Sequence, residues 1–220
     1  MKFFLDSAQV QEIEYALKMW NIDGVTTNPR HVQTSGKPFL QVIREIGLLF
    51  EGTNKPISVE VNPHYTEYTD MVTEGQKLAA MCPNFVIKLP ATEAGFKAVA
   101  VLKEKGIQSN LTLVFSPVQA LQAMRMGAAF CSPFIGWKES NGEETVSLIQ
   151  EIAAIRDNYS FTTEIIVAAV RNGRQIVEAG LAQADVVTAG MDVFKDAFDH
   201  PYTHVGLKKF ADFWDKTPYE

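Results

Sequence analysis

Basic residues, long apolar runs and dinucleotide-binding glycine motifs are all scarce in this chain of 220 residues. Lys and Arg number 20 against 26 Asp and Glu, and no basic run occurs, so we expect no nucleic-acid partner. No segment approaches the roughly 20 apolar residues that span a bilayer, and the apolar run after Lys2 is too short for a signal peptide. These absences predict a soluble, cytoplasmic protein without membrane contact.

Cysteine is also rare. Cys82 and Cys131 each stand alone in apolar surroundings, without the spacing of metal ligands. We therefore expect two buried free thiols, no disulfide and no metal site.

Short apolar runs of the kind that form buried parallel strands recur along the chain. Eight of them lie at residues 2–5, 24–26, 57–61, 85–89, 108–114, 130–135, 164–169 and 185–188. Amphipathic stretches with helical period lie between them at residues 8–20, 66–81, 93–105, 117–126, 143–156 and 172–179.

This alternation predicts a parallel sheet. Eight βα units of about 27 residues each favour a single-domain (β/α)8 TIM barrel over residues 1–220. A doubly wound open sheet is the alternative. It is weakened because no Gly-x-Gly-x-x-Gly motif follows any predicted strand.

Lys88 is a lone amine within an apolar run. It lies in the segment Asn84-Phe-Val-Ile-Lys-Leu-Pro90, near the end of a predicted strand. An unpartnered ammonium costs several kcal/mol to bury, so a lysine in such a place tends to lose its proton and attack carbonyls. The alternative is a strand-end lysine that reaches solvent or pairs with a carboxylate.

Barrel active sites lie where the strands end. The residues at the ends of the predicted strands are Asp6, Asn28, Glu60, Lys88, Asn110, Thr112, Phe134 and Arg171. Asp6 also suits a helix cap, Asn28 before Pro29 a turn, and Thr112 an ordinary strand position. Their occurrence at matching strand ends nevertheless predicts one polar site at one mouth of the barrel.

Four motifs resemble those of a known family. They are Asp23-Gly-Val-Thr-Thr-Asn-Pro29, Val86-Ile-Lys-Leu-Pro90, Asn110-Leu-Thr-Leu-Val-Phe-Ser116 and Ser132-Pro-Phe-Ile-Gly136. In this order and spacing over the whole chain, they resemble the transaldolase family in the short form shared with fructose-6-phosphate aldolases. The resemblance implies a (β/α)8 barrel, a Schiff base on Lys88, small sugar substrates and no cofactor.

The resemblance also implies a role for each residue. Lys88 would attack C2 of the ketose, and Asp6 would take the proton of the C4 hydroxyl. Glu60 would act as acid and base through a water held by Thr112, which keeps the carboxylate away from the lysine. The hydroxyls of the three-carbon fragment would be held by Asn28, Asn110 and Ser132.

Two positions bear on whether the fragment is transferred or hydrolysed. In the aldolase branch of the family, a glutamine stands at the position of Glu60 and a tyrosine at that of Phe134. A phenyl ring offers the enamine no proton, so the pattern here resembles the transferase branch.

The anion site departs from the family pattern. The family has an arginine where Trp137 stands and a serine where Ala169 stands, while Arg171 remains. Arg30 and His31 replace a serine and an apolar residue. Phosphate is close to a dianion, whereas a sulfonate is a monoanion with weaker acceptors, so fewer cations and an indole N–H favour a sulfonate.

The resemblance therefore leads us to expect 6-deoxy-6-sulfofructose as donor and sulfolactaldehyde as product. The expected acceptor is glyceraldehyde 3-phosphate or erythrose 4-phosphate. If Trp137 only packs and Lys138 or Arg30 binds phosphate, an ordinary sugar-phosphate transaldolase or fructose-6-phosphate aldolase is the alternative. A non-catalytic sugar-binding barrel is disfavoured by the intact set of Asp6, Glu60, Lys88 and Thr112.

Short members of the family form decamers of two pentamers, with a C-terminal helix that reaches a neighbour. The aromatic-rich segment at about 204–220 suits such a helical arm, although terminal aromatics can equally cap their own barrel. A homo-oligomer is therefore expected by resemblance.

Overall fold

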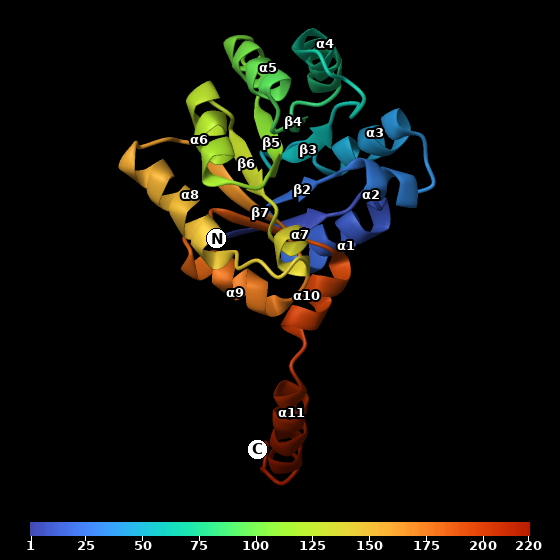
Figure 1. Ribbon diagram of the computed structural model, residues 1–220. Coiled ribbons are helices and arrows are strands. Elements are labelled where there is room, and N and C mark those ends of the chain that lie inside the picture. Colours follow the sequence, from blue (N-terminus) through green and yellow to red (C-terminus); the bar gives the residue numbers. More distant parts are fainter.

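A computed structural model describes all residues from 1 to 220. Eight parallel strands pair in chain order, and β1 also pairs with β8, so the sheet closes into a barrel (Figure 1). The strands are β1 Lys2–Asp6, β2 Gly24–Thr26, β3 Ile57–Glu60, β4 Phe85–Pro90, β5 Ser109–Val114, β6 Phe130–Pro133, β7 Glu164–Val170 and β8 Val186–Ala189. The (β/α)8 prediction is confirmed, and the open-sheet alternative is wrong because the closed sheet has no edge.

Helices surround this barrel on its outer face (Figure 1). The helices of the chain are α1 Val10–Trp20, α2 Pro29–Thr34, α3 Phe39–Leu49, α4 Tyr68–Ala79, α5 Glu93–Glu104, α6 Pro117–Met126, α7 Ile135–Ser140, α8 Val146–Asn158, α9 Gly173–Leu181, α10 Met191–Phe198 and α11 Pro201–Trp214, of which α11 extends away from the barrel. All six predicted helices are present. The predictions did not include α2, α3, α7 or α10; α2 and α7 have six residues each, too few to display a helical period.

Side-chain caps start several helices soon after a strand ends. Asn28, Thr92, Ser116 and Asn172 each accept a hydrogen bond from the backbone N–H three residues later, at the start of α2, α5, α6 and α9. Asn28 is thus both a cap and a residue of the barrel mouth.

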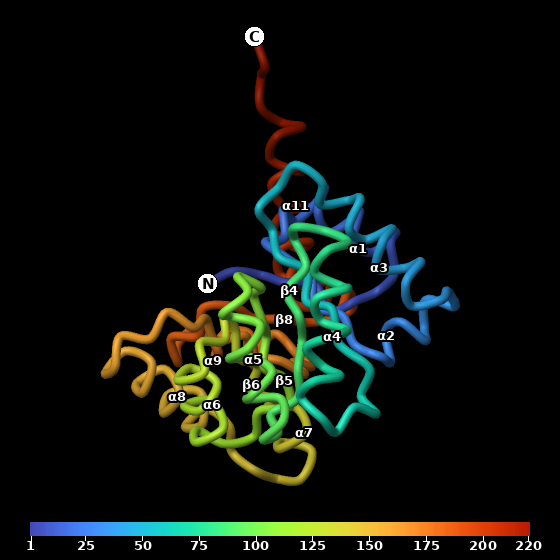
Figure 2. Tube along the Cα trace, turned by 90° about the horizontal axis from the view of Figure 1, so that it is seen from above, coloured from blue at the N-terminus to red at the C-terminus, as the bar shows by residue number.

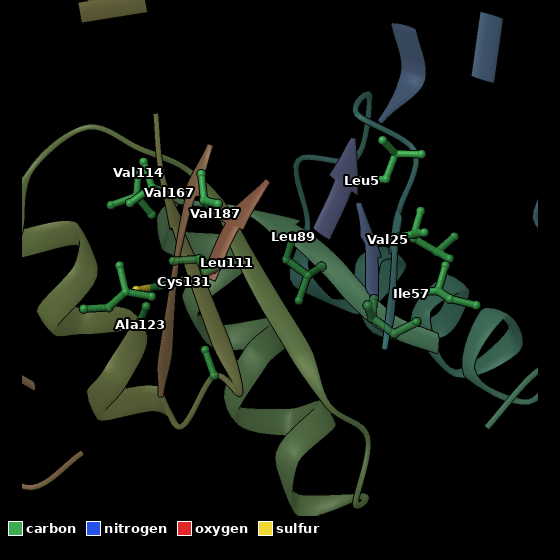
Figure 3. Packing of buried hydrophobic residues seen from close by; sticks show 14 of the residues in the cluster. Leu5, Val25, Ile57, Leu89, Leu111, Val114, Ala123, Cys131, Val167 and Val187 are labelled. Atoms are coloured by element: carbon green, nitrogen blue, oxygen red, sulfur yellow. The ribbon is translucent and has the colours of Figure 1, made fainter. Parts of the chain in front are cut away.

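Successive residues of each strand face opposite sides of the barrel wall. The outward residues pack against the helices in the main hydrophobic core, which includes Leu5, Val25 and Leu89 (Figure 3). Cys131 belongs to this core, and burial raises the pKa of its thiol to about 12, so it stays protonated. Cys82 is partly buried, and both cysteines are free thiols.

Inside the barrel, the end at which the strands begin is filled by a second hydrophobic cluster, which we call the floor. It consists of Phe4, Val86, Phe130, Ile166 and Val186. One step further along the strands the interior becomes polar, with buried Thr26, Ser58, Lys88, Asn110, Ser132 and Thr188. The floor therefore closes one end of the barrel, and the polar layer faces the other.

Two strands carry irregularities next to the mouth. Leu113 in β5 and Ala169 in β7 have positive φ angles of 58° and 59°, and the pairing register shifts at both places. Gly136 in α7 lies against this bend in β7, since a Cβ added to it would lie 2.1 Å from the carbonyl oxygen of Ala169. Glycine at this position lets α7 pack closely over β7.

The C-terminal segment contains helix α11, which projects away from the barrel (Figures 1 and 2). None of its residues is buried. No helix in the structure is long and apolar enough to cross a membrane.

Candidate active site

A cavity of about 630 Å³ opens where the barrel strands end, a size typical of small-molecule sites. Ten of the eleven predicted site residues line it. They are Asp6, Asn28, Arg30, Glu60, Lys88, Thr112, Ser132, Phe134, Trp137 and Arg171.

Lys88 lies at the bottom of this cavity and is only 4% exposed. Its Nζ lies 3.1 Å from Oε2 of Glu60 and donates to the carbonyl oxygen of Thr27 at 3.0 Å. Glu60 and Lys88 are register partners on β3 and β4, so their side chains emerge side by side. The expectation of a carboxylate kept away from the lysine is therefore wrong, because parallel pairing sets the two groups in direct contact.

Thr112 contains the only buried side-chain oxygen or nitrogen in the structure that has no hydrogen-bond partner. Its Oγ1 belongs to a residue that lines the cavity, next to the bend at Leu113. An unpaired buried hydroxyl is costly, so this one is suited to bind an oxygen of a ligand or of a water in the cavity.

Asp6 is held through both of its carboxylate oxygens. Thr26 Oγ1 donates to Oδ1 at 2.8 Å, and His31 Nε2 lies 3.0 Å from Oδ2. Burial alone would raise the pKa of Asp6, but the hydrogen bond from His31, the charges of His31 and Lys88 and the bond from Thr26 together lower it. Asp6 is thus an ionised carboxylate at neutral pH, and it does not cap α1, whose cap residue is Gln9.

Asn110 does not line the cavity. It is fully buried in the polar layer, where its Nδ2 donates to Ser58 Oγ at 3.0 Å and its Oδ1 accepts from Ser132 Oγ at 2.8 Å. These bonds form because the side chain of Asn110 points into the barrel interior, where it reaches Ser58 on β3, two strands away, and Ser132 on the neighbouring β6. In this arrangement Asn110 orients Ser132, which does line the cavity.

Two cationic side chains of the cavity have no carboxylate partner. No Asp or Glu oxygen lies within 4.0 Å of the guanidinium of Arg30 or Arg171, although Arg171 donates to Ser140 Oγ. Lys138, by contrast, forms an ion pair with Glu143 and is absent from the cavity wall. Arg30 and Arg171 are therefore the two cations able to receive an anion there.

Trp137 belongs to an aromatic group and lines the same cavity as Arg30 and Arg171. Its ring lies 5.8 Å from Phe115 and 5.7 Å from Phe134, measured between ring centroids, yet 53% of the residue is exposed. Trp137 therefore packs against two rings and also lines the cavity. The sequence left open whether this residue packs or faces the substrate, and its position allows both.

Sequence reasoning missed the contact between His31 and Asp6. His31 was noted only as a departure from a family pattern, and Thr26 only as part of a motif. The residues around His31 in the sequence do not indicate that its side chain, in the first turn of α2, reaches Asp6 at the end of β1. Only the pairing of β1 with β2 brings these residues together.

Comparison with known proteins identifies the family. Residues 3–217 match the transaldolase/fructose-6-phosphate aldolase family. The chain belongs to this family. It is an enzyme of the transaldolase type, and members typically act through a Schiff base.

Several curated relatives are similar over their full length. A protein of Priestia aryabhattai and one of Priestia megaterium, each named 6-deoxy-6-sulfo-D-fructose transaldolase, are 56% identical over all of this chain and 98% of theirs. A probable transaldolase of Dictyoglomus turgidum is 45% identical over 99% of this chain and 100% of its own.

A solved structure of thiamine phosphate pyrophosphorylase from Pyrococcus furiosus has a similar fold. The TM-score is 0.64 with 14% identity, and the match covers 89% of this chain and 91% of that one. At this identity the likeness supports the barrel fold alone.

Proposed function

We propose that the protein transfers a dihydroxyacetone unit from 6-deoxy-6-sulfofructose to glyceraldehyde 3-phosphate or erythrose 4-phosphate and releases sulfolactaldehyde. The observation that carries this proposal is the composition of the cavity. It combines a buried lysine in contact with a carboxylate, a second ionised carboxylate, two arginines without a carboxylate partner, and an indole. Relatives named for the same donor at 56% identity support it.

The first half of the reaction uses the contact between Lys88 and Glu60. Glu60 takes a proton from the ammonium of Lys88, and the neutral amine attacks C2 of the ketose. The protonated Glu60 then gives that proton to the hydroxyl of the carbinolamine, which leaves as water and generates the iminium. The hydroxyl of Thr112, which lacks a partner, hydrogen-bonds the departing oxygen.

Asp6 carries out the cleavage. Its carboxylate takes the proton of the C4 hydroxyl as the C3–C4 bond breaks, and the electron pair of that bond moves into the iminium to form an enamine. The aldehyde fragment then leaves. When an acceptor arrives, the enamine attacks its carbonyl carbon, and Asp6 returns the proton to the new alkoxide. Asn28 and Ser132 bind hydroxyls of the retained fragment, and Asn110 orients Ser132.

The anionic head group is bound by Arg30, Trp137 and Arg171. Two guanidinium groups without carboxylate partners supply positive charge, and Trp137 supplies an N–H donor and an apolar face. This set suits a sulfonate, whose single charge and weak acceptor oxygens need fewer cations than phosphate. Lys138 takes no part, because Glu143 neutralises it.

The decisive experiment compares kcat/KM for 6-deoxy-6-sulfofructose and for fructose 6-phosphate with one acceptor. We expect the sulfonate donor to be preferred. Reduction with borohydride in the presence of either donor should add a three-carbon mass to Lys88. A preference for fructose 6-phosphate contradicts the sulfonate assignment, and the absence of any adduct contradicts the Schiff base.

An ordinary sugar-phosphate transaldolase is the second candidate. It is favoured by the acceptors themselves, whose phosphate must enter the same cavity as the sulfonate. Arg30 and Arg171 would then hold both kinds of head group. The same comparison of kcat/KM separates the two candidates.

We also propose a homo-oligomer in which α11 docks on a neighbouring copy, by family resemblance a decamer of two pentamers. This proposal is supported by the projecting helix, which exposes many apolar side chains to solvent. Monomeric proteins rarely expose so large an apolar surface. They are Tyr202, Val205, Leu207, Phe210, Phe213 and Trp214. Light scattering on the full chain and on a variant that ends at His200 tests this, since only the full chain should form the larger assembly.

A further inference from the structure

His31 lines the same cavity as Lys88 and Asp6. It stands in the first turn of α2, directly after Arg30, and its backbone N–H donates to the side chain of Asn28. Its ring turns toward the barrel, where Nε2 lies 3.0 Å from Oδ2 of Asp6. No other side chain forms a hydrogen bond or an ion pair with this oxygen of Asp6.

The contact completes a hydrogen-bonded chain around the Asp6 carboxylate. Thr26 gives its hydroxyl proton to Oδ1 of Asp6, so in its 2.6 Å contact with Thr188 it must accept. Thr26 can therefore fix only one oxygen, and the carboxylate would remain free to rotate about its Cβ–Cγ bond. His31 holds the second oxygen and fixes the plane of the group. A neutral imidazole donates here from Nε2, and the imidazolium donates equally.

We propose that His31 is a positioning residue for the cleavage step: it orients the Asp6 carboxylate so that a lone pair faces the C4 hydroxyl of the donor. This inference rests on the role proposed for Asp6. His31 acts after the Schiff base has formed, because Lys88 and Glu60 form that intermediate through atoms that His31 does not touch.

The proposal also predicts a pH effect. The charged groups that line the cavity together with Asp6 and His31 are Glu12 on α1, Arg30 on α2, Glu60 on β3, Lys88 on β4, Arg171 after β7 and Asp192 on α10. Burial raises the pKa of Asp6, and the hydrogen bond and charge of His31 are the largest of the effects that lower it. Removing His31 leaves the burial and the neighbours in place, so the pKa of Asp6 rises. The acid limb of the kcat/KM profile then moves to higher pH.

The test compares His31→Leu, which cannot donate, with His31→Gln, whose Nε2 can donate from a similar reach. His64→Leu is the matched control, because His64 is an exposed histidine outside the cavity. We expect His31→Leu to lower kcat by roughly ten- to hundredfold with little change in KM. His31→Gln should recover most of this loss, and His64→Leu should match the wild type.

Borohydride trapping without an acceptor identifies the step that is affected. The wild type should carry mainly the three-carbon adduct of cleaved donor on Lys88, whereas His31→Leu should accumulate the adduct of the intact six-carbon ketose. A merely structural role would reduce both adducts together. The proposal is overturned if His31→Leu keeps the wild-type adduct ratio and kcat, or if His31→Gln is as slow as His31→Leu. If the wild type itself forms no adduct, the proposed function fails instead.

Discussion

The floor and the polar layer of the barrel interior are built by the same strands, only two residues apart. On β4 the floor residue is Val86 and the polar residue is Lys88; on β6 they are Phe130 and Ser132. The floor side chains contact one another and exclude water. The polar side chains are also buried, but each has a hydrogen-bond partner supplied from another strand across the barrel interior or from the residue after that strand.

This contrast indicates that the floor positions and the polar positions of a strand have different roles. A packed floor lowers the local dielectric below the site and strengthens the interaction between Lys88 and Glu60. Gly24 on β2 makes room for the floor, since a Cβ there would lie 2.8 Å from the ring of Phe4. Substitutions in the floor should therefore act on stability, and those in the polar layer on chemistry.

The largest effect should come from the centre of the polar layer. Lys88→Ala should lower turnover by at least about ten-thousandfold, because no other amine lines the cavity to form the Schiff base. The fold should persist, as checked by circular dichroism, since alanine faces the cavity. Lys138→Ala is the control, because that lysine is paired with Glu143 outside the site, and its activity should remain close to normal. Appreciable turnover by Lys88→Ala would falsify the Schiff-base assignment.

Two substitutions on β6 test the difference between the floor and the polar layer. Phe130→Ala should reduce the free energy of unfolding by about 3–5 kcal/mol, because it leaves a cavity among tightly packed side chains. Ser132→Ala, two residues further, should cost only about 1 kcal/mol through the lost bond to Asn110 but should lower kcat/KM. Chemical denaturation together with activity per folded molecule separates the two. Equal losses of stability would break the distinction between the layers.

The next prediction concerns the residues that bind the anionic head group. Trp137→Arg combined with Ala169→Ser adds two hydrogen-bond donors suited to a dianion, each contributing roughly 1.5–3 kcal/mol. The ratio of kcat/KM for the two sugars should therefore shift roughly a hundredfold toward fructose 6-phosphate. Arg171→Ala, in contrast, should weaken both donors. A ratio that does not move in the folded double variant would make Trp137 a packing residue only.

The smallest expected effect concerns the fate of the enamine. Phe134→Tyr combined with Glu60→Gln should raise the release of dihydroxyacetone relative to transfer by roughly tenfold, because a phenol beside the site can supply a proton. Product analysis with and without an acceptor measures this partition. Phe134→Leu serves as a control that alters packing but adds no proton donor. If dihydroxyacetone does not increase, these two positions do not set the partition.

Much of the fold could be predicted because its signals are local. Strands that are buried on both faces appear in the sequence as short apolar runs. All eight strands were predicted, with bounds within a few residues of those in the structure. The helix α3 was missed although it lies between two predicted strands. The short α2 and α7 were missed because six residues span less than two helical turns. Both short helices carry residues of the cavity, so Arg30 and Trp137 were predicted as site residues while the helices that position them were not.

The sequence by itself determined the barrel, the family and the set of polar groups at the strand ends, because strand periodicity and motif spacing are properties of short segments. Only the tertiary structure decided which of these groups touch. It set Glu60 against Lys88, neutralised Lys138 with Glu143, moved Asn110 below the cavity and joined His31 to Asp6. Such contacts depend on strand register and on the course of loops, which neither the strand periodicity nor the spacing of the motifs specifies.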